Sequence, residues 1–275
     1  MSNSDQPQIK EVAKNNISFR VVVNNWGNFW RRVECSDWEP QTFQIFDEFI
    51  DSDCIYIDVG AWIGPTVLYA AQFAKFTYAF EPDPVAFREL KSNITANNDS
   101  DWISRVVINN KAISSASGTL RIGSRGGGGD SMSSALFSDE GTSWEVEAIT
   151  IDQLVETEGL QHMSMFIKMD IEGGEYELIP ELTRFFDQHD VNLYLSMHPE
   201  FHAISLKQKD KVKMKFFSRF LLAWHQLKLL LMLPFKYLYG SNGVRLNLFI
   251  LTLKSLVKGE FIHEVVATNK RWKKS

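Results

Sequence analysis

Three short segments of the sequence combine residue types that could do chemistry. They are IDVGAWIG at 57–64, IKMDIEGGE at 167–175 and SMHPE at 196–200. Each follows or contains an apolar run typical of a buried strand and continues into Asp, Glu, Gly or His. Side chains that follow the strands of a parallel sheet meet at its carboxyl edge, where such sheets bind ligands. We therefore expect the three segments to build one site.

The first segment is typical of a strand that turns through glycine into a helix. Gly60 and Gly64 let the backbone approach a ligand closely, and Pro65 suits the first turn of a helix. The next expected strand, residues 76–80, ends at Glu81. A carboxylate at this place suits hydrogen bonding to the two hydroxyls of a ribose. The pattern predicts a nucleoside-type ligand.

The residues of this turn favour one nucleoside over another. A dinucleotide fingerprint has the form G-x-G-x-x-G, whereas this turn reads GAWIG and follows Asp58. A carboxylate there would repel a pyrophosphate but attract the amine or sulfonium of S-adenosylmethionine. The turn therefore favours the methyl donor over a nicotinamide cofactor. The alternative, in which Asp58 only caps the helix and Glu81 lies at the surface, remains open.

The second segment places several charged groups around one strand end. Asp170 and Glu172 come just after an expected strand, and Glu175 begins the next helix, where the helix dipole favours a carboxylate. Lys168 lies on the strand itself, so its ammonium needs a carboxylate partner. The group is typical of a catalytic rim, although simple helix capping by Asp170 and Glu175 is an alternative.

The third segment ends the neighbouring strand with His198. Histidine titrates near neutrality and is the commonest general base, so we expect His198 to face the same crevice as the carboxylates. The carboxylates could instead hold a divalent cation that acidifies a hydroxyl. The sequence has no ligand spacing that decides between these two roles.

The elements that must position these groups alternate along the chain. Short apolar runs and helical patterns with short connections predict an α/β fold with a parallel sheet covered on both faces. We expect residues 1–50 to form an N-terminal extension, its first 16 residues frayed, and residues 51–275 to form one domain. The expected strands are 19–23, 55–59, 76–80, 105–109, 166–169 and 192–197; the expected helices are 41–50, 66–73, 85–97 and 175–186. A hairpin of strands 245–253 and 261–267 would close the sheet, and residues 123–134 form a loop that either links elements or covers a ligand.

The composition agrees with a globular protein but hides a charge asymmetry. The chain has 275 residues, 44% hydrophobic and 23% charged, which excludes collagen-like and disordered classes. Its two cysteines are too few for a disulfide framework, and the polar N-terminus does not resemble a signal peptide, so we expect a cytoplasmic protein. Residues 1–200 carry 14 Lys and Arg against 31 Asp and Glu, whereas residues 201–275 carry 15 against 3.

The basic residues gather in a helical insertion at about 203–240. Charged residues interrupt every window of about 20 residues, which disfavours a membrane span. A basic amphipathic pair of helices suits peripheral association with a membrane through residues 206–239. A helical cap with a solvated lysine face is the alternative. A nucleic-acid partner is not expected, because the lysines precede Leu- and Phe-rich helices and do not line an aromatic groove.

Taken in order, the motifs resemble the FkbM family of S-adenosylmethionine-dependent methyltransferases. The resemblance runs from the segment WEPQT at 38–42 to His198. It also includes FEPDP at 80–84, residues 90–93, NKAIS at 110–114 and ITIDQL at 149–154. The family usually has Asn where this chain has Trp62.

The resemblance implies a class I methyltransferase fold, Rossmann-like, with a mostly parallel seven-stranded sheet. It implies S-adenosyl-L-methionine as cofactor and a hydroxyl of a saccharide, glycan or glycolipid as acceptor. Resemblance and position assign the cofactor to Glu39, Asp58, Gly60, Ala61, Gly64, Glu81, Pro82, Asn93, Ala112 and Asp170. They assign catalysis to Lys168, Asp170, Glu172, Glu175 and His198, with His198 or Asp170 as base. The competing functions are a nicotinamide-dependent oxidoreductase and a non-catalytic adaptor at a membrane surface.

Overall fold

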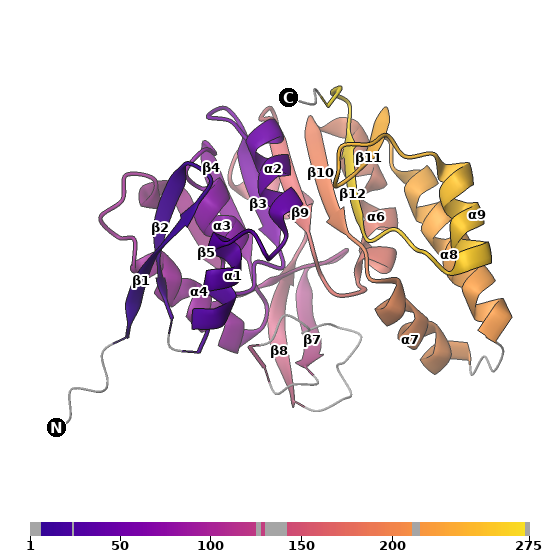
Figure 1. Cartoon of the computed structure of the whole chain (residues 1–275), viewed down its shortest axis with the longest axis horizontal. Helices are drawn as coiled ribbons and strands as arrows, with labels where there is room; N and C mark the ends of the chain where they lie inside the picture. The colour runs from indigo at the N-terminus through magenta and orange to yellow at the C-terminus, as the bar shows by residue number, and fades with distance from the viewer. Residues whose placement is uncertain (1–6, 24, 125–127, 130–141, 211–214, 273–275) are drawn as a thin grey trace.

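The central feature of the computed structural model is a seven-stranded sheet (Figure 1). The structure describes residues 7–23, 25–124, 128–129, 142–210 and 215–272. Across the sheet the strand order is β11-β12-β10-β9-β3-β4-β5. The strands are β3 (Ile55–Val59), β4 (Phe76–Phe80), β5 (Val106–Asn109), β9 (Met165–Met169), β10 (Val191–Ser196), β11 (Tyr237–Gly240) and β12 (Glu264–Thr268).

Five neighbouring strands, from β10 to β5, run parallel, and β12 pairs antiparallel with both β10 and β11. The register places Asp58 of β3 beside Lys168 of β9. Because the parallel strands end at the same edge, the residues after β3, β4, β9 and β10 are brought together. The predicted α/β fold with a mostly parallel sheet is confirmed.

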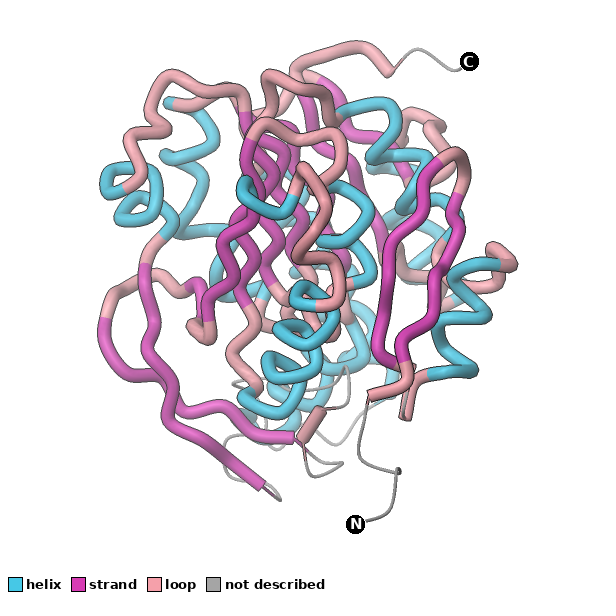
Figure 2. Tube along the Cα trace, turned by 90° about the vertical axis from the view of Figure 1, so that its left-hand side faces the viewer, coloured by secondary structure: helices cyan, strands magenta, loops and turns pink. Residues whose placement is uncertain are grey.

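Alternating side chains bury both faces of the sheet. In β3, Ile55, Ile57 and Val59 join one apolar cluster, whereas Tyr56 joins the other. The first cluster lies under α5 (Ile151–Thr157), α6 (Glu175–Gln188) and α8 (Lys215–Met232). The opposite face is covered by α1 (Gly27–Glu34), α2 (Pro40–Phe49), α3 (Pro65–Ala70) and α4 (Pro84–Thr95). Figure 2 shows these helices around the central strands.

Two small sheets accompany the large one. β1 (Ile9–Lys14) and β2 (Ile17–Val22) form an antiparallel hairpin, so the prediction that the first 16 residues fray is wrong for β1. Its Val12 is fully buried, which holds this strand against the domain. The sequence also failed to predict β6 (Ala112–Ile113), β7 (Gly118–Ser124) and β8 (Thr142–Ile149), which pair in the order β6-β8-β7. The predicted loop at 123–134 lies mostly outside the described residues, and its first two residues end β7.

The C-terminal part differs from the prediction. After α7 (Pro199–Asp210) and α8, strand β11 is followed by helix α9 (Leu248–Lys258), so the strand predicted at 245–253 is wrong. Asn247 caps this helix by accepting a hydrogen bond from the Ile250 amide, and Gly259 ends it in the left-handed conformation. A short apolar run fits a strand or a buried helix equally well, so periodicity alone does not decide. Among the described residues, no helix is both long and apolar enough to cross a bilayer.

Candidate active site

The site is a cavity of about 440 Å³ at the carboxyl edge of the sheet. Its walls include residues from the turns after β3, β4, β9 and β10, which are the turns that the sequence indicates. Predicted residues that line it are Glu39, Gly60, Ala61, Glu81, Pro82, Ala112, Lys168, Asp170, Glu172 and His198. The three predicted segments therefore meet in one place.

The turn after β3 is held closely against the end of β9. Gly60 has a φ of 88°, and a Cβ atom built on it would lie 1.9 Å from the carbonyl oxygen of Asp170. The amides of Gly60 and Ala61 both donate to the carbonyl of Phe80 at 3.0 Å. Only glycine satisfies both the backbone conformation and the contact. Gly60 thus lets two ligand-facing turns lie side by side.

Asp58 does not line the cavity, contrary to its expected place beside the cofactor. Its side chain is fully buried, and its Oδ2 accepts hydrogen bonds from the hydroxyls of Tyr56 and Thr66, both at 2.6 Å. Its Oδ1 lies 3.5 Å from the ammonium of Lys168. Asp58 therefore lies in the core below the turn, where its charge compensates that of the buried Lys168.

Lys168 is the cation of the cavity floor. Its Nζ is 3.5 Å from carboxylate oxygens of both Asp58 and Asp170. Burial alone would lower the pKa of Lys168, but the charges of Asp58, Asp170 and Glu39 outweigh it and raise the pKa above its usual value. Lys168 thus remains an ammonium and orients carboxylates; it does not accept protons.

Glu81 is nearly buried and lies between two backbone donors. Its Oε2 accepts from the amide of Trp62 at 2.7 Å and its Oε1 from the amide of Asp83 at 2.8 Å. Burial raises the pKa of Glu81 to about 8 in spite of these hydrogen bonds. A ligand that donates hydrogen bonds or carries positive charge would stabilise the carboxylate form.

Glu39 also lines the cavity, at the start of α2, with a left-handed φ of 39°. Its Oε2 accepts a hydrogen bond from the hydroxyl of Thr42 at 3.1 Å. Burial raises the pKa of Glu39 to about 7, with a further increase from Asp170 and a decrease from Lys168. A cation beside Glu39 would return this group to its charged form.

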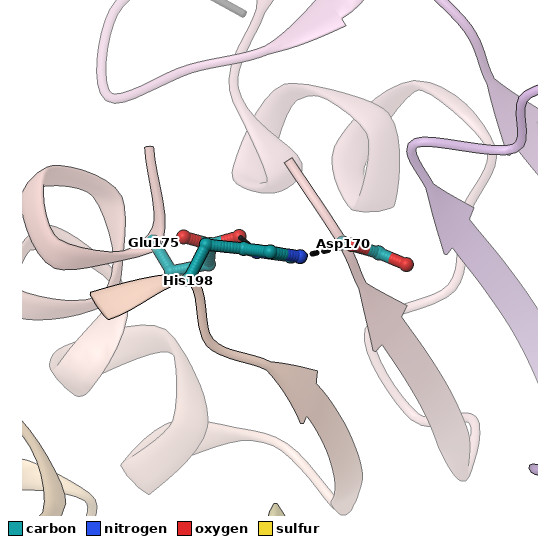
Figure 3. A group of neighbouring side chains, drawn as sticks. All are labelled: Asp170, Glu175 and His198. Atoms are coloured by element: carbon teal, nitrogen blue, oxygen red, sulfur yellow. Dashed lines mark hydrogen bonds and ion pairs between the residues drawn. The ribbon is translucent and has the colours of Figure 1, made fainter. Parts of the chain in front are cut away.

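His198 is the centre of the predicted catalytic rim. Its Nδ1 is hydrogen-bonded to Oε1 of Glu175 at 3.0 Å, and its Nε2 lies 3.5 Å from oxygens of Asp170 and of Glu172. Figure 3 shows the imidazole lying between Glu175 and Asp170. Burial lowers the pKa of His198, but the hydrogen bond that its Nδ1–H donates to Glu175 and the three carboxylate charges raise it to about 9. The imidazole is therefore mainly protonated at neutral pH.

The carboxylates of the rim differ in burial, in contact with the cavity and in pKa. Glu175 is fully buried, does not line the cavity, and also accepts the amide of Ile171 at 3.1 Å. Glu172 has a left-handed φ of 53°, and burial raises its pKa to about 8. Among the described residues, Oε2 of Glu175 and Oδ1 of Asp170 are buried and have no hydrogen-bond partner. The rim thus retains capacity to accept hydrogen bonds or a cation.

Besides Asp58, two more predicted cofactor residues lie away from the cavity. Asn93 is buried and ties helix α4 to its neighbours, since it donates to the carbonyl of Ile63 and accepts from the amide of Val22, both at 2.8 Å. Gly64 has a φ of 93°, and a Cβ on it would lie 2.6 Å from the side chain of Leu90. Both residues support the turn from within the core.

The sequence did not predict the aromatic wall of the cavity. Phe29, Trp38 and Trp62 line it, and Phe29 contacts both tryptophans edge to face at 5.1 and 4.7 Å between ring centroids. Trp62 holds a φ of 49°, a conformation that Asn adopts more readily than a bulky residue. Its indole nitrogen donates to the carbonyl of Gly129 at 3.0 Å. The aromatic residues at 26–30 are visible in the sequence and could have indicated an aromatic wall. Their position relative to the cavity, however, depends on tertiary structure.

Comparison with known proteins agrees with this site. The strand order and the cavity at the carboxyl ends of the strands are those of a class I methyltransferase fold. The family model described as "Methyltransferase FkbM domain" matches residues 58–221, more than half of the chain. The chain therefore belongs to the FkbM methyltransferase family, which confirms the resemblance. No curated protein matches it.

Several solved structures are similar to the chain. One is methyltransferase FkbM from Methylobacillus flagellatus KT, with 14% identity and a TM-score of 0.39 over 62% of this chain and 50% of that one. Trm5b from Pyrococcus abyssi has 14% identity and a TM-score of 0.36, over 76% and 49% of the two chains. TYW2 from M. jannaschii, solved in complex with AdoMet, has 13% identity and a TM-score of 0.34, over 74% of each chain. The chain thus spans about half the length of the FkbM structure.

Proposed function

We propose that this chain is an S-adenosylmethionine-dependent O-methyltransferase acting on a hydroxyl of a saccharide, glycan or glycolipid. One observation carries the proposal. A buried carboxylate, Glu175, holds His198 at 3.0 Å so that its Nε2 lies among cavity-lining groups, beside the turn of Gly60. This is the arrangement of an oriented general base at a cofactor-binding edge.

The cavity fits the charge of the cofactor. Five carboxylates line it, namely Glu39, Glu81, Asp170, Glu172 and Glu177. Three Lys and Arg side chains also line it: Lys168 is paired with carboxylates, Lys111 is 2.8 Å from Glu147, and Arg32 donates to the backbone carbonyl of Asp37 at 3.4 Å. Oδ1 of Asp170 is buried and has no hydrogen bond, although it lies 3.5 Å from Nε2 of His198, so it adds capacity for a donor. S-adenosylmethionine carries an ammonium and a sulfonium, which such walls would stabilise.

Residue roles follow from these positions. Glu81 would hold the ribose hydroxyls, the turn of Gly60 and Ala61 would hold the amino-acid part, and Glu39 and Asp170 would face the positive charge. The bound cofactor supplies an electrophilic methyl group. His198 in its neutral form takes the proton of the acceptor hydroxyl at Nε2, and Glu175 stabilises the imidazolium that results. Most of the remaining catalysis is positioning.

The cavity walls also support the acceptor class. Phe29 and Trp38 line the cavity with apolar rings, and Arg32 lines it too. The apolar face of a sugar ring packs well against such aromatic rings, while its hydroxyls meet the polar rim. The family match favours methyl transfer over the nicotinamide-dependent alternative.

The test begins with ligand binding. Titration calorimetry should give binding of S-adenosylhomocysteine and none of NAD(H), and the reverse result would overturn the cofactor assignment. Isotopically labelled S-adenosylmethionine, incubated with the protein and a set of free sugars, glycans and glycolipids, should then yield a methyl ether that mass spectrometry locates on a sugar hydroxyl. Label found only on nitrogen, or on no saccharide, would contradict the proposed acceptor.

A specific observation favours a second mechanism for the same reaction. Asp170, Glu175 and His198 each offer one ligand atom within 4.8 Å of the others, and two of their buried carboxylate oxygens have no hydrogen bond among the described residues. A divalent cation held there would lower the pKa of the acceptor hydroxyl. Turnover in chelator decides between the two: unchanged activity supports His198 as base, and activity restored only by added Mg²⁺ or Mn²⁺ supports the cation.

A further inference from the structure

The C-terminal helices expose an unusual share of the apolar side chains. Eleven large hydrophobic residues are exposed among the described residues, and eight of them lie between 220 and 257. They include Phe249, with 78% of its surface exposed, and Val257, with 67%. A group of exposed apolar side chains of this kind marks an interaction site more often than a solvated face.

The exposed residues of α9 share one face of the helix. Phe249, Ile250, Leu253 and Val257 are spaced as one helical face requires. The opposite face, which contains Leu251 and Ser255, packs against α8. Helix α9 is therefore apolar on both sides, with only one side covered by the protein.

Helix α8 adds a second apolar stripe. Phe220, Trp224 and Leu231 are exposed and lie four and seven residues apart, on one side of the helix. Ala223 and Leu230 face α9 instead. Figure 1 shows α8 and α9 side by side at one end of the molecule. We name the exposed residues of α8 and α9, together with Val244, the C-terminal apolar surface.

Basic residues dominate the segment that carries this surface, and Glu260 at its end lies 4.0 Å from Lys258. No Asp or Glu lies between Asp210 and Glu260, and that span carries nine basic residues. They are Lys211, Lys213, Lys215, Arg219, Lys228, Lys236, Arg245, Lys254 and Lys258. The exposed Lys254 and Lys258 lie on α9 itself. In a dimer built on this surface the same positive charges would face each other, whereas an anionic surface would neutralise them.

We propose that the C-terminal apolar surface binds the face of an anionic lipid membrane. Exposed aromatic and aliphatic side chains enter the interfacial region, and the lysines contact anionic headgroups. No helix of the described part is suited to span a bilayer, so the association is interfacial. The sequence alone points to residues 206–239, whereas the structure adds α9 as the most exposed apolar element. The proposal is independent of the reaction assigned to the cavity.

Vesicle flotation tests this proposal without an activity assay. The full chain is mixed with vesicles of phosphatidylcholine alone or with one third phosphatidylglycerol. We expect flotation with the anionic vesicles, at least tenfold stronger than with the neutral ones, and a decrease at high salt. The triple variant Phe249→Gln, Leu253→Gln, Val257→Gln should lose at least tenfold in partitioning, and Lys254→Gln with Lys258→Gln should lose the preference for anionic lipid.

A matched control tests whether flotation depends on the C-terminal apolar surface or on any exposed hydrophobic residues. Ile9→Gln, Phe76→Gln and Val107→Gln replace three exposed hydrophobic residues elsewhere on the molecule and should leave flotation unchanged. Circular dichroism and thermal melting check that each variant folds. No flotation of the unmodified chain, equal binding to neutral vesicles, or equal loss in the control variant would overturn the proposal. So would a dimer, measured by light scattering, that the α9 variant dissociates.

Discussion

His198 is hydrogen-bonded through Nδ1 to Oε1 of Glu175 at 3.0 Å, and Glu175 is fully buried behind it. The pair joins the first residue of α6 to the residue that follows β10 by two positions. A buried carboxylate on one ring nitrogen fixes the orientation of the imidazole and leaves the other nitrogen for the reaction.

Turnover should rise with pH up to about 9 if His198 is the base. The carboxylates of Glu175, Asp170 and Glu172 raise the pKa of His198 to about 9, although burial opposes the shift. Only the neutral imidazole accepts a proton, so its fraction increases as pH rises towards that value. A pH profile of kcat with saturating substrates measures this, and His198→Ala should reduce turnover by ~100-fold. A flat profile in the unmodified chain, or near-normal turnover in the variant, would move the role to Asp170.

Glu175→Gln should shift this profile to lower pH. The substitution keeps a hydrogen-bond acceptor for Nδ1 but removes the charge that contributes most to the raised pKa of His198. The apparent pKa in kcat should therefore fall by about one unit or more, and the plateau rate should fall because the base is weaker. Glu172→Gln serves as the control, because Glu172 lies 3.5 Å from Nε2 without a hydrogen bond and should shift the profile less. Equal shifts in the two variants would contradict the dominant role of Glu175.

Glu81→Ala should weaken the cofactor site. The carboxylate lies on the cavity wall and accepts two backbone amides, which leaves lone pairs for ligand hydroxyls. Loss of charge-assisted hydrogen bonds costs about 2 kcal/mol, or roughly a thirtyfold increase in the Kd of S-adenosylhomocysteine by calorimetry. Glu156→Ala, at an exposed position of α5, should leave the Kd unchanged. A similar Kd in both variants would mean that the ribose lies elsewhere.

The sequence predicted which strand ends form the site, because glycines, proline and polar residues follow apolar runs at Asp58, Glu81, Asp170 and His198. It did not predict which of these carboxylates line the cavity. That distinction depends on strand register, which puts Asp58 beside Lys168 and below the turn. Register is a tertiary property, and no local pattern in the chain encodes the partner of Asp58.

In the fold, too, some elements follow from local sequence patterns and others depend on tertiary structure. Strands β3, β4 and β9 were predictable from short apolar runs between breakers, whereas helix α9 was mistaken for a strand. Its run LFILTL suits either conformation. The side chain of Asn247 caps the first turn and so favours the helix. The aromatic wall was also beyond prediction, because Phe29 and Trp62 meet across thirty-odd residues of chain only after folding.

Gly60→Ala should destabilise the fold strongly. The new methyl group would overlap the carbonyl of Asp170, at 1.9 Å, in a backbone conformation with φ of 88°. Gly159→Ala is a matched control: its φ is 67°, but no atom lies within 4 Å of the added Cβ. The control measures the conformational cost alone, about 1–2 kcal/mol. Urea denaturation should show a clearly larger loss of unfolding free energy for Gly60→Ala, and equal losses would contradict the close contact between the two turns.

Asp58 and Lys168 should behave as a coupled buried pair. Asp58→Asn would leave the ammonium of Lys168 with less compensation, at a cost of about 3–5 kcal/mol in unfolding free energy. The variant with both Asp58→Asn and Lys168→Met should recover much of this loss, because neither charge then remains buried. A double-mutant cycle by urea denaturation measures the coupling. Additive losses would show that Asp58 acts through Tyr56 and Thr66 alone, and a Kd change for S-adenosylhomocysteine without a stability change would place Asp58 at the ligand after all.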